Sequence, residues 1–131
     1  MDNSNSYQEI TNFISKTESA SPGYYIISGL KDNEGCVITK ERNQTIDIWN
    51  LSEKEWFLIQ VNREHWLPIP PGQIDRRTPA IKRMNSIGPQ KISAQNLEND
   101  VLTLWPNFNI ETLMTVVMIS SEDYMFVDLR C

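Results

Sequence analysis

Residues 24–49, YYIISGLKDNEGCVITKERNQTIDIW, carry the pattern that decides the fold. Residues 24–28 (YYIIS) are aromatic and β-branched, residues 36–40 (CVITK) contain three β-branched residues, and a turn-forming Asp-Asn pair lies between the two. This arrangement predicts a β-hairpin. Residues 45–49 alternate in polarity with a period of two, which predicts a third strand.

The segment that follows, residues 56–61 (WFLIQV), is apolar on both faces when extended. A strand of this kind is covered on both sides, so we expect a sheet that lies between a helix layer and a second sheet. Residues 62–75 contain three prolines and a glycine and predict a long loop.

Three helices are expected around these strands. Residues 6–17 place their apolar side chains on one face at helical spacing. Thr78 as N-cap and Pro79 at the first helical position predict a second helix, which a Gly-Pro pair ends. Ser93 is expected to cap a third helix that continues to Trp105.

Two further strands, residues 110–119 and 124–129, are predicted to close the chain as a hairpin. Strands and helices are segregated along the sequence, and most strands follow one another through short turns. The fold class that this order predicts is α+β, with mostly antiparallel strands and flanking helices.

The composition of the chain argues against several classes of function, among them nucleic-acid binding and zinc binding. The chain has 131 residues, enough for one domain, and a hydrophobic share of 40% that suits a folded globular protein. Its net charge of −5 gives no reason to expect a nucleic acid partner. Two cysteines and one histidine are too few for a disulfide framework or a zinc site, and we predict neither a metal nor a cofactor.

Four stretches resemble, in order and spacing, the C-terminal half of the acid ceramidase and N-acylethanolamine acid amidase family. They are residues 35–40 followed by 46–49, residues 56–66, residues 75–80, and residues 115–118. The most specific feature is an N-x-x-H-W motif that begins at Asn62 and is followed some 14 residues later by D-R-R.

The resemblance implies an N-terminal-nucleophile hydrolase, whose fold is a four-layer α-β-β-α sandwich and whose nucleophile is a Cys exposed by self-cleavage. Residues 1–131 would form only the C-terminal portion of the amidase domain, and the nucleophilic Cys would belong to a missing N-terminal part. The implied substrate is a lipid amide, either ceramide or an N-acylethanolamine. The implied location is lysosomal or secreted, although the first residues of this chain lack the pattern of a signal peptide.

The resemblance also implies site residues. Amide hydrolysis passes through an oxyanion, and a side-chain amide can donate to it without titrating. Asn62 matches the family's asparagine and is expected to be this donor, while Arg76 matches a site arginine that orients acidic or carbonyl groups. Arg77 competes with Arg76, because the loop here is one residue longer than in the relatives. Trp66 is the best candidate for a substrate-binding pocket wall.

Other polar residues have simpler interpretations. His65 is not expected to act as the base, because in this hydrolase type the nucleophile's own α-amine takes the proton. Cys36 is internal to a predicted strand and is expected to be a small buried hydrophobe. Asn43 and Asn50 match the N-glycosylation pattern.

Three hypotheses for function therefore stand: part of an active amidase, a truncated non-catalytic relative, or a lipid-binding remnant that lacks the nucleophile.

Overall fold

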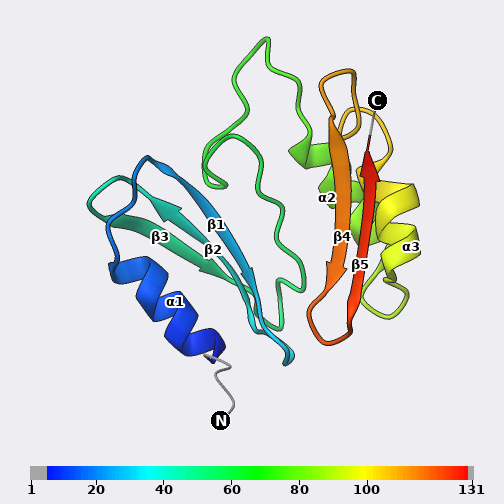
Figure 1. The fold of residues 1–131 in the computed structure, drawn as a ribbon. Helices are drawn as coiled ribbons and strands as arrows, with labels where there is room; N and C mark the ends of the chain where they lie inside the picture. The colour runs from blue at the N-terminus through cyan, green and yellow to red at the C-terminus, as the bar shows by residue number, and fades with distance from the viewer. Residues whose placement is uncertain (1–5, 130–131) are drawn as a thin grey trace. The chain divides into compact units, whose positions relative to one another are not determined.

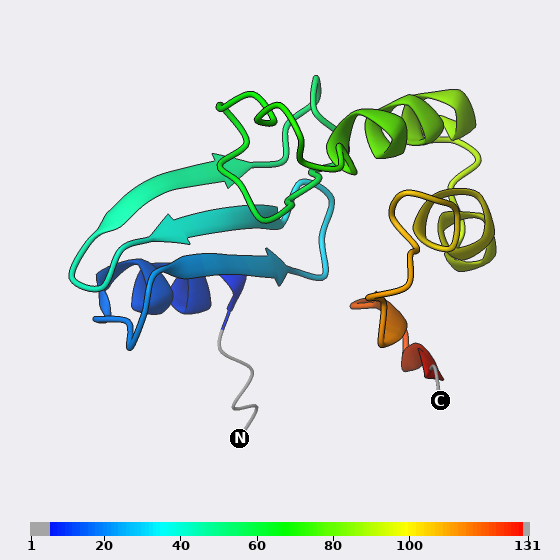
Figure 2. The same cartoon turned by 90° about the horizontal axis from the view of Figure 1, so that it is seen from above.

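The computed structural model describes residues 6–129 (Figures 1 and 2). They form two compact units, one ending at Leu58 and the other beginning at Ile59. Residues 51–60, which span the boundary between the two units, contain no helix or strand.

The first unit contains a three-stranded antiparallel sheet in the order β1-β2-β3. Strand β1 (Gly23–Ser28) pairs with β2 (Gly35–Lys40), which in turn pairs with β3 (Thr45–Asn50). The predicted hairpin and the predicted third strand are confirmed. In the tight connection between β1 and β2, Asn33 adopts a positive φ of 64°, a conformation that asparagine tolerates better than most residues.

Helix α1 (Tyr7–Lys16) lies across one face of this sheet, as Figure 2 shows in blue. It begins at a capping box. The Ser6 hydroxyl accepts from the Glu9 N–H at 3.3 Å, and the Glu9 carboxylate accepts from the Ser6 N–H at 2.8 Å. The predicted helix is confirmed to within one residue at each end.

The C-terminal end of α1 is tied to the sheet by Lys40, whose side chain is only 3% exposed. Its Nζ donates to the Ile14 carbonyl oxygen at 2.8 Å and to that of Thr17. The Thr45 hydroxyl donates to the Ser15 carbonyl at 2.7 Å. Carbonyls at a helix end have no partner within the helix and carry negative partial charge, so they suit an ammonium group.

The central strand β2 is the core of the first unit. All six of its residues are buried, and Cys36, Val37 and Ile38 are at most 1% exposed. This confirms the interpretation of Cys36 as a buried hydrophobe.

The prediction of a strand at residues 56–61 is wrong. Apart from an isolated bridge between Val61 and Arg63, this segment pairs with no strand within residues 6–129. An apolar sequence favours an extended backbone, but only a neighbouring strand supplies the hydrogen bonds that make it part of a sheet.

The second unit contains two α-helices, a short π-helix and a two-stranded sheet. In chain order they are α2 (Arg77–Ile87), α3 (Ala94–Leu97), η1 (Glu98–Leu102), β4 (Met114–Ile119) and β5 (Tyr124–Leu129). Its buried apolar residues are Ala80, Met84, Val101 and Val117. The α+β class with antiparallel strands is therefore confirmed in both units.

Two predicted boundaries in this unit are wrong. Ser93 does cap the third helix, but the helix ends at Leu102 and not at Trp105; the Thr103 N–H and hydroxyl both donate to the Glu98 carbonyl of its last turn. The strand predicted from residue 110 begins only at Met114, since residues 109–112 form a turn closed by a 3.0 Å hydrogen bond.

The β4–β5 hairpin has two unlike faces. On one face, Thr115 and Val117 of β4 are buried. The opposite face carries three directly paired apolar couples, and four of its six side chains are more than half exposed. We call it the open face; it consists of Met114 with Leu129, Val116 with Val127, and Met118 with Met125.

Candidate active site

Asn62 follows the extended segment and is exposed. The backbone on both sides of it is held by Gln60, whose side-chain amide donates to the Val61 carbonyl at 2.6 Å and to the Arg63 carbonyl at 2.9 Å. The position of Asn62 is therefore fixed although no regular strand contains it.

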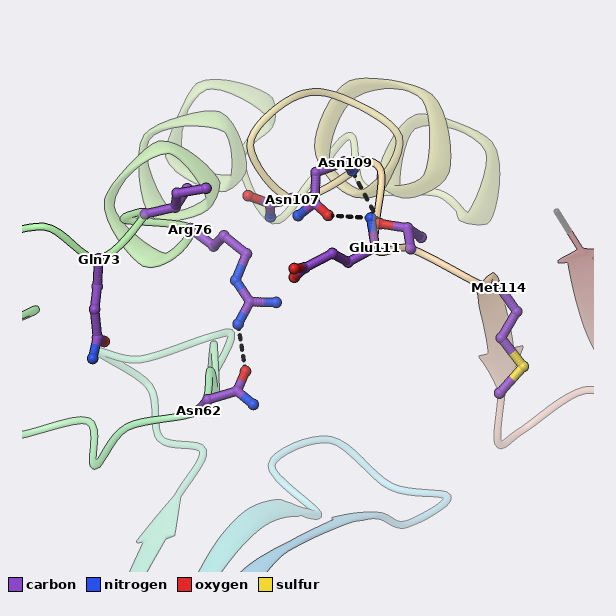
Figure 3. Close-up of a pocket in the computed structure, with 9 residues that line it drawn as sticks. Asn62, Gln73, Arg76, Asn107, Asn109, Glu111 and Met114 are labelled. Carbon is purple, nitrogen blue, oxygen red and sulfur yellow. Dashed lines mark hydrogen bonds between the residues drawn. The ribbon is translucent and has the colours of Figure 1, made fainter.

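Arg76 lies against Asn62. Its Nη2 donates a hydrogen bond to the Asn62 side-chain oxygen, and Figure 3 shows the two side chains pointing toward each other. Because the guanidinium can only donate, it selects the oxygen end of the amide. The Nδ2 group of Asn62, which is the donor end, therefore points away from Arg76.

Asn62 and Arg76 line a cavity of about 560 Å³ within the second unit. The cavity wall is mostly polar. Its remaining residues are Gln73, Ile74, Asn107, Asn109, Glu111, Thr112 and Met114. Figure 3 shows the Glu111 side chain extending toward Arg76 from the opposite wall.

The polar wall formed by residues 107–112 was missed by sequence reasoning, which assigned part of it to a strand. Its turn is built by asparagine: Asn109 Oδ1 accepts from the Glu111 N–H at 2.8 Å, and the Asn109 N–H donates to the Thr112 hydroxyl at 3.0 Å. The N-x-N-x-E-T pattern directly after Pro106 is the signal that favours a turn over a strand.

Helix α2 holds Arg76 and Arg77 at its N-terminus. The predicted cap, Thr78, is wrong: Asp75 does the capping, since its Oδ1 accepts from the N–H of Arg77 at 2.9 Å and from that of Thr78 at 3.0 Å. Pro79 is the third residue of the helix, where a missing N–H still costs no intrahelical bond. The hydrogen bonds from the Thr78 side chain and backbone lower the pKa of the Asp75 carboxyl.

Arg77 points to a different part of the loop than Arg76. Its guanidinium donates to four backbone carbonyls between residues 63 and 67. Of the two competing arginines, Arg76 is the one that contacts Asn62.

The remaining predicted residues lie apart from the cavity wall. Trp66 is 46% exposed and its ring packs edge-on against His65, with centroids 4.9 Å apart. It does not line the cavity that contains Asn62. Asn43 and Asn50 are both exposed in the first unit, and their glycosylation stays a prediction. Cys131 lies outside the described residues.

Within residues 6–129 no group of His, Cys, Asp and Glu side chains is arranged to hold a metal ion. None of the helices described is both long and apolar enough to span a membrane.

The chain is similar in sequence to two kinds of lipid amidase. It is 39% identical over 121 residues to the N-acylethanolamine-hydrolyzing acid amidase of Mus musculus, a match that covers 91% of this chain and 33% of the relative. It is 36% identical over 125 residues to the acid ceramidase of Macaca fascicularis, covering 94% of this chain and 31% of that one. The chain thus spans about a third of the length of these relatives. No family model matches it.

A solved structure extends the likeness to the fold. The Caenorhabditis elegans N-acylethanolamine-hydrolyzing acid amidase ortholog matches with a TM-score of 0.79 and 29% sequence identity. The match covers 93% of this chain and 51% of that chain. It confirms the prediction of a partial N-terminal-nucleophile hydrolase fold.

Proposed function

Because the chain belongs to the acid ceramidase and N-acylethanolamine acid amidase family, we propose that it is the C-terminal portion of an amidohydrolase that cleaves the N-acyl bond of ceramide or of N-acylethanolamines. The observation that supports this most is the pairing of Arg76 with Asn62 on the wall of a polar cavity.

Asn62 is the proposed oxyanion donor. When the amide carbonyl is attacked, negative charge develops on its oxygen, and a donor already fixed in place stabilises that charge by about 3–4 kcal/mol. Arg76 donates a hydrogen bond to the Asn62 side-chain oxygen, so the Nδ2 hydrogens of Asn62 are the ones available to the substrate.

The cavity suits the polar part of a lipid amide. Amide and carboxylate side chains dominate its wall, while Ile74 and Met114 are the only large apolar residues among those that line it. We therefore assign it to the amide and head group. Trp66, which is 46% exposed, stays the proposed wall for the acyl chain.

The nucleophile is proposed to come from the N-terminal part of the same amidase. Cys36 is a poor candidate for it, because its side chain is 1% exposed in the central strand of the first unit. The names of the relatives refer to acid enzymes, and we propose a lysosomal or secretory location for this protein.

The proposal is tested by replacing Asn62 in the full-length enzyme. Asn62→Ala is expected to lower the turnover number by about 100- to 1,000-fold, with a steady Michaelis constant and unchanged folding. Asn85→Ala, which truncates an exposed asparagine of α2, is the matched control and should be neutral. Turnover of Asn62→Ala equal to that of the control rules out the oxyanion role.

A further inference from the structure

We propose that Arg77 is a positioning residue: its guanidinium shapes the loop of residues 63–67 and thereby holds Asn62 in the orientation that the reaction needs. This inference rests on the proposed role of Asn62. It gives the neighbouring arginines separate tasks, since Arg76 contacts the Asn62 side chain and Arg77 contacts only backbone.

The contacts of Arg77 converge from one short loop. Its Nη1 donates to the carbonyl oxygens of His65 at 3.1 Å and Leu67 at 2.8 Å. Its Nη2 donates to those of Arg63 at 3.0 Å and Glu64 at 2.9 Å. Four carbonyls from five consecutive residues thus point at one planar cation.

Such a loop depends on the cation at its centre. Carbonyl dipoles that converge repel one another, and a buried carbonyl without a donor is unfavourable. The rigid fork of a guanidinium presents several N–H groups in fixed directions, whereas an ammonium is a compact charge with three donors. The Nε atom of Arg77 is buried and has no acceptor among the described residues, so the hydrogen bonds of this guanidinium to the loop all run through Nη1 and Nη2.

The loop is joined directly to Asn62. The Arg63 carbonyl accepts both from Arg77 and from the Gln60 amide, and Gln60 also donates to the Val61 carbonyl. Asn62 lies between these two fixed carbonyls. If the Arg63 carbonyl turns, the direction of the Asn62 side chain changes with it.

Helix α2 offers a matched control in Arg83. Its Nη2 donates to the Trp105 carbonyl at 2.8 Å and its Nη1 to that of Leu104 at 3.4 Å. Like Arg77, Arg83 belongs to α2 and binds backbone carbonyls. Neither Arg83 nor the two residues it binds line the cavity. A comparison with Arg83 therefore separates the effect of losing any arginine–carbonyl contact from the effect of losing the contacts of Arg77.

The experiment compares Arg77→Lys, Arg83→Lys, Asn62→Ala and the Asn62→Ala/Arg77→Lys double variant in the full-length enzyme. Turnover numbers are normalised to titrated active sites, so that a lower yield of folded enzyme does not count as lower activity. Arg77→Lys should lower the turnover number by about 10-fold or more with the Michaelis constant within about twofold, whereas Arg83→Lys should stay within about twofold of the parent. The double variant should be no slower than Asn62→Ala, because Arg77 acts through Asn62.

Hydrogen exchange of the full-length enzyme gives a second readout. The Leu67 amide, which donates to the Glu64 carbonyl at 3.1 Å, should exchange faster in Arg77→Lys and not in Arg83→Lys. The inference is overturned if Arg77→Lys turns over like Arg83→Lys, or if the losses of Asn62→Ala and Arg77→Lys multiply in the double variant. Normal turnover of Asn62→Ala alone is a different result: it overturns the proposed function of Asn62, whatever the exchange of the loop shows.

Discussion

In the first unit, Lys40 donates to carbonyl oxygens at the end of α1; in the second, Arg77 donates to carbonyl oxygens of the loop at residues 63–67. Both are cations satisfying backbone acceptors that regular structure leaves unpaired. The difference lies in what they hold. Lys40 joins a helix to a sheet, and each of these elements already has its own hydrogen-bond pattern. Arg77 holds a loop that has almost none.

This difference predicts that the first unit contributes mainly to stability and the second mainly to turnover. Substitutions that remove support from the first unit should change the stability of the protein and leave turnover per folded molecule unchanged. Substitutions around the loop and the N-terminus of α2 should change turnover more than stability.

Lys40→Met should lower the free energy of unfolding by about 1.5–3 kcal/mol, because carbonyls at the end of α1 lose a charged donor in a buried position. Thermal or urea denaturation measures the loss. Lys54→Met, at an exposed lysine of the same unit, should be neutral. This expectation is contradicted if the turnover number of Lys40→Met, normalised to titrated active sites, is as low as that of a variant of the candidate site.

Arg76→Ala should lower turnover by about 10- to 100-fold, the range that corresponds to one hydrogen bond from a charged donor. The cause is loss of the group that orients the Asn62 amide. His65→Ala in the same steady-state assay should do much less, because the expected base is the nucleophile's α-amine. If instead His65→Ala abolishes activity and Arg76→Ala is nearly normal, the mechanism must be built around the imidazole.

Asp75→Asn should reveal a pH-dependent contribution from the cap of α2. The folded state lowers the Asp75 pKa, so the stabilisation is complete above the ordinary carboxyl value near 3.9 and is lost as pH falls through the lower folded value. At pH 5–7 the variant should be less stable by about 0.5–1 kcal/mol. Urea titrations at several pH values should show this difference vanish in strong acid.

The two units also differ in how their strands are covered. Strand β2 is buried throughout, while the open face of the β4–β5 hairpin exposes methionine and leucine side chains. Isolated 131-residue chain should therefore bind a hydrophobic dye and associate. Replacing the paired Met118 and Met125 by threonine should reduce both effects, with a stability change within about 0.5 kcal/mol. A monodisperse, dye-silent parent chain contradicts this expectation.

Local patterns predicted the first unit well. The alternation at residues 45–49, the β-branched residues of β1 and β2, and the helical spacing of apolar residues in 6–17 each act over a few residues, and each agrees with the packing that follows. What they could not reveal is Lys40, because its acceptors lie more than 20 residues away in the sequence.

The second unit was harder to predict because its decisive contacts are not local. The Asp75 and Thr78 side chains are both acceptable caps by residue type, and only the folded geometry selects Asp75. Arg76 and Arg77 are adjacent, yet they contact different targets about 14 residues back along the chain. The resemblance to the amidases brought attention to Asn62 and Arg76, but it named Arg77 only as a competitor of Arg76.

The central claim is that Asn62 donates to the oxyanion of amide hydrolysis. Its most direct test is a crystal structure of the full-length enzyme with a transition-state analogue on the nucleophile. The account predicts the analogue's oxyanion about 2.7–3.1 Å from Asn62 Nδ2, with Arg76 still bound to Asn62 Oδ1. An oxyanion held by other donors, with the Asn62 amide turned away from it, contradicts the account.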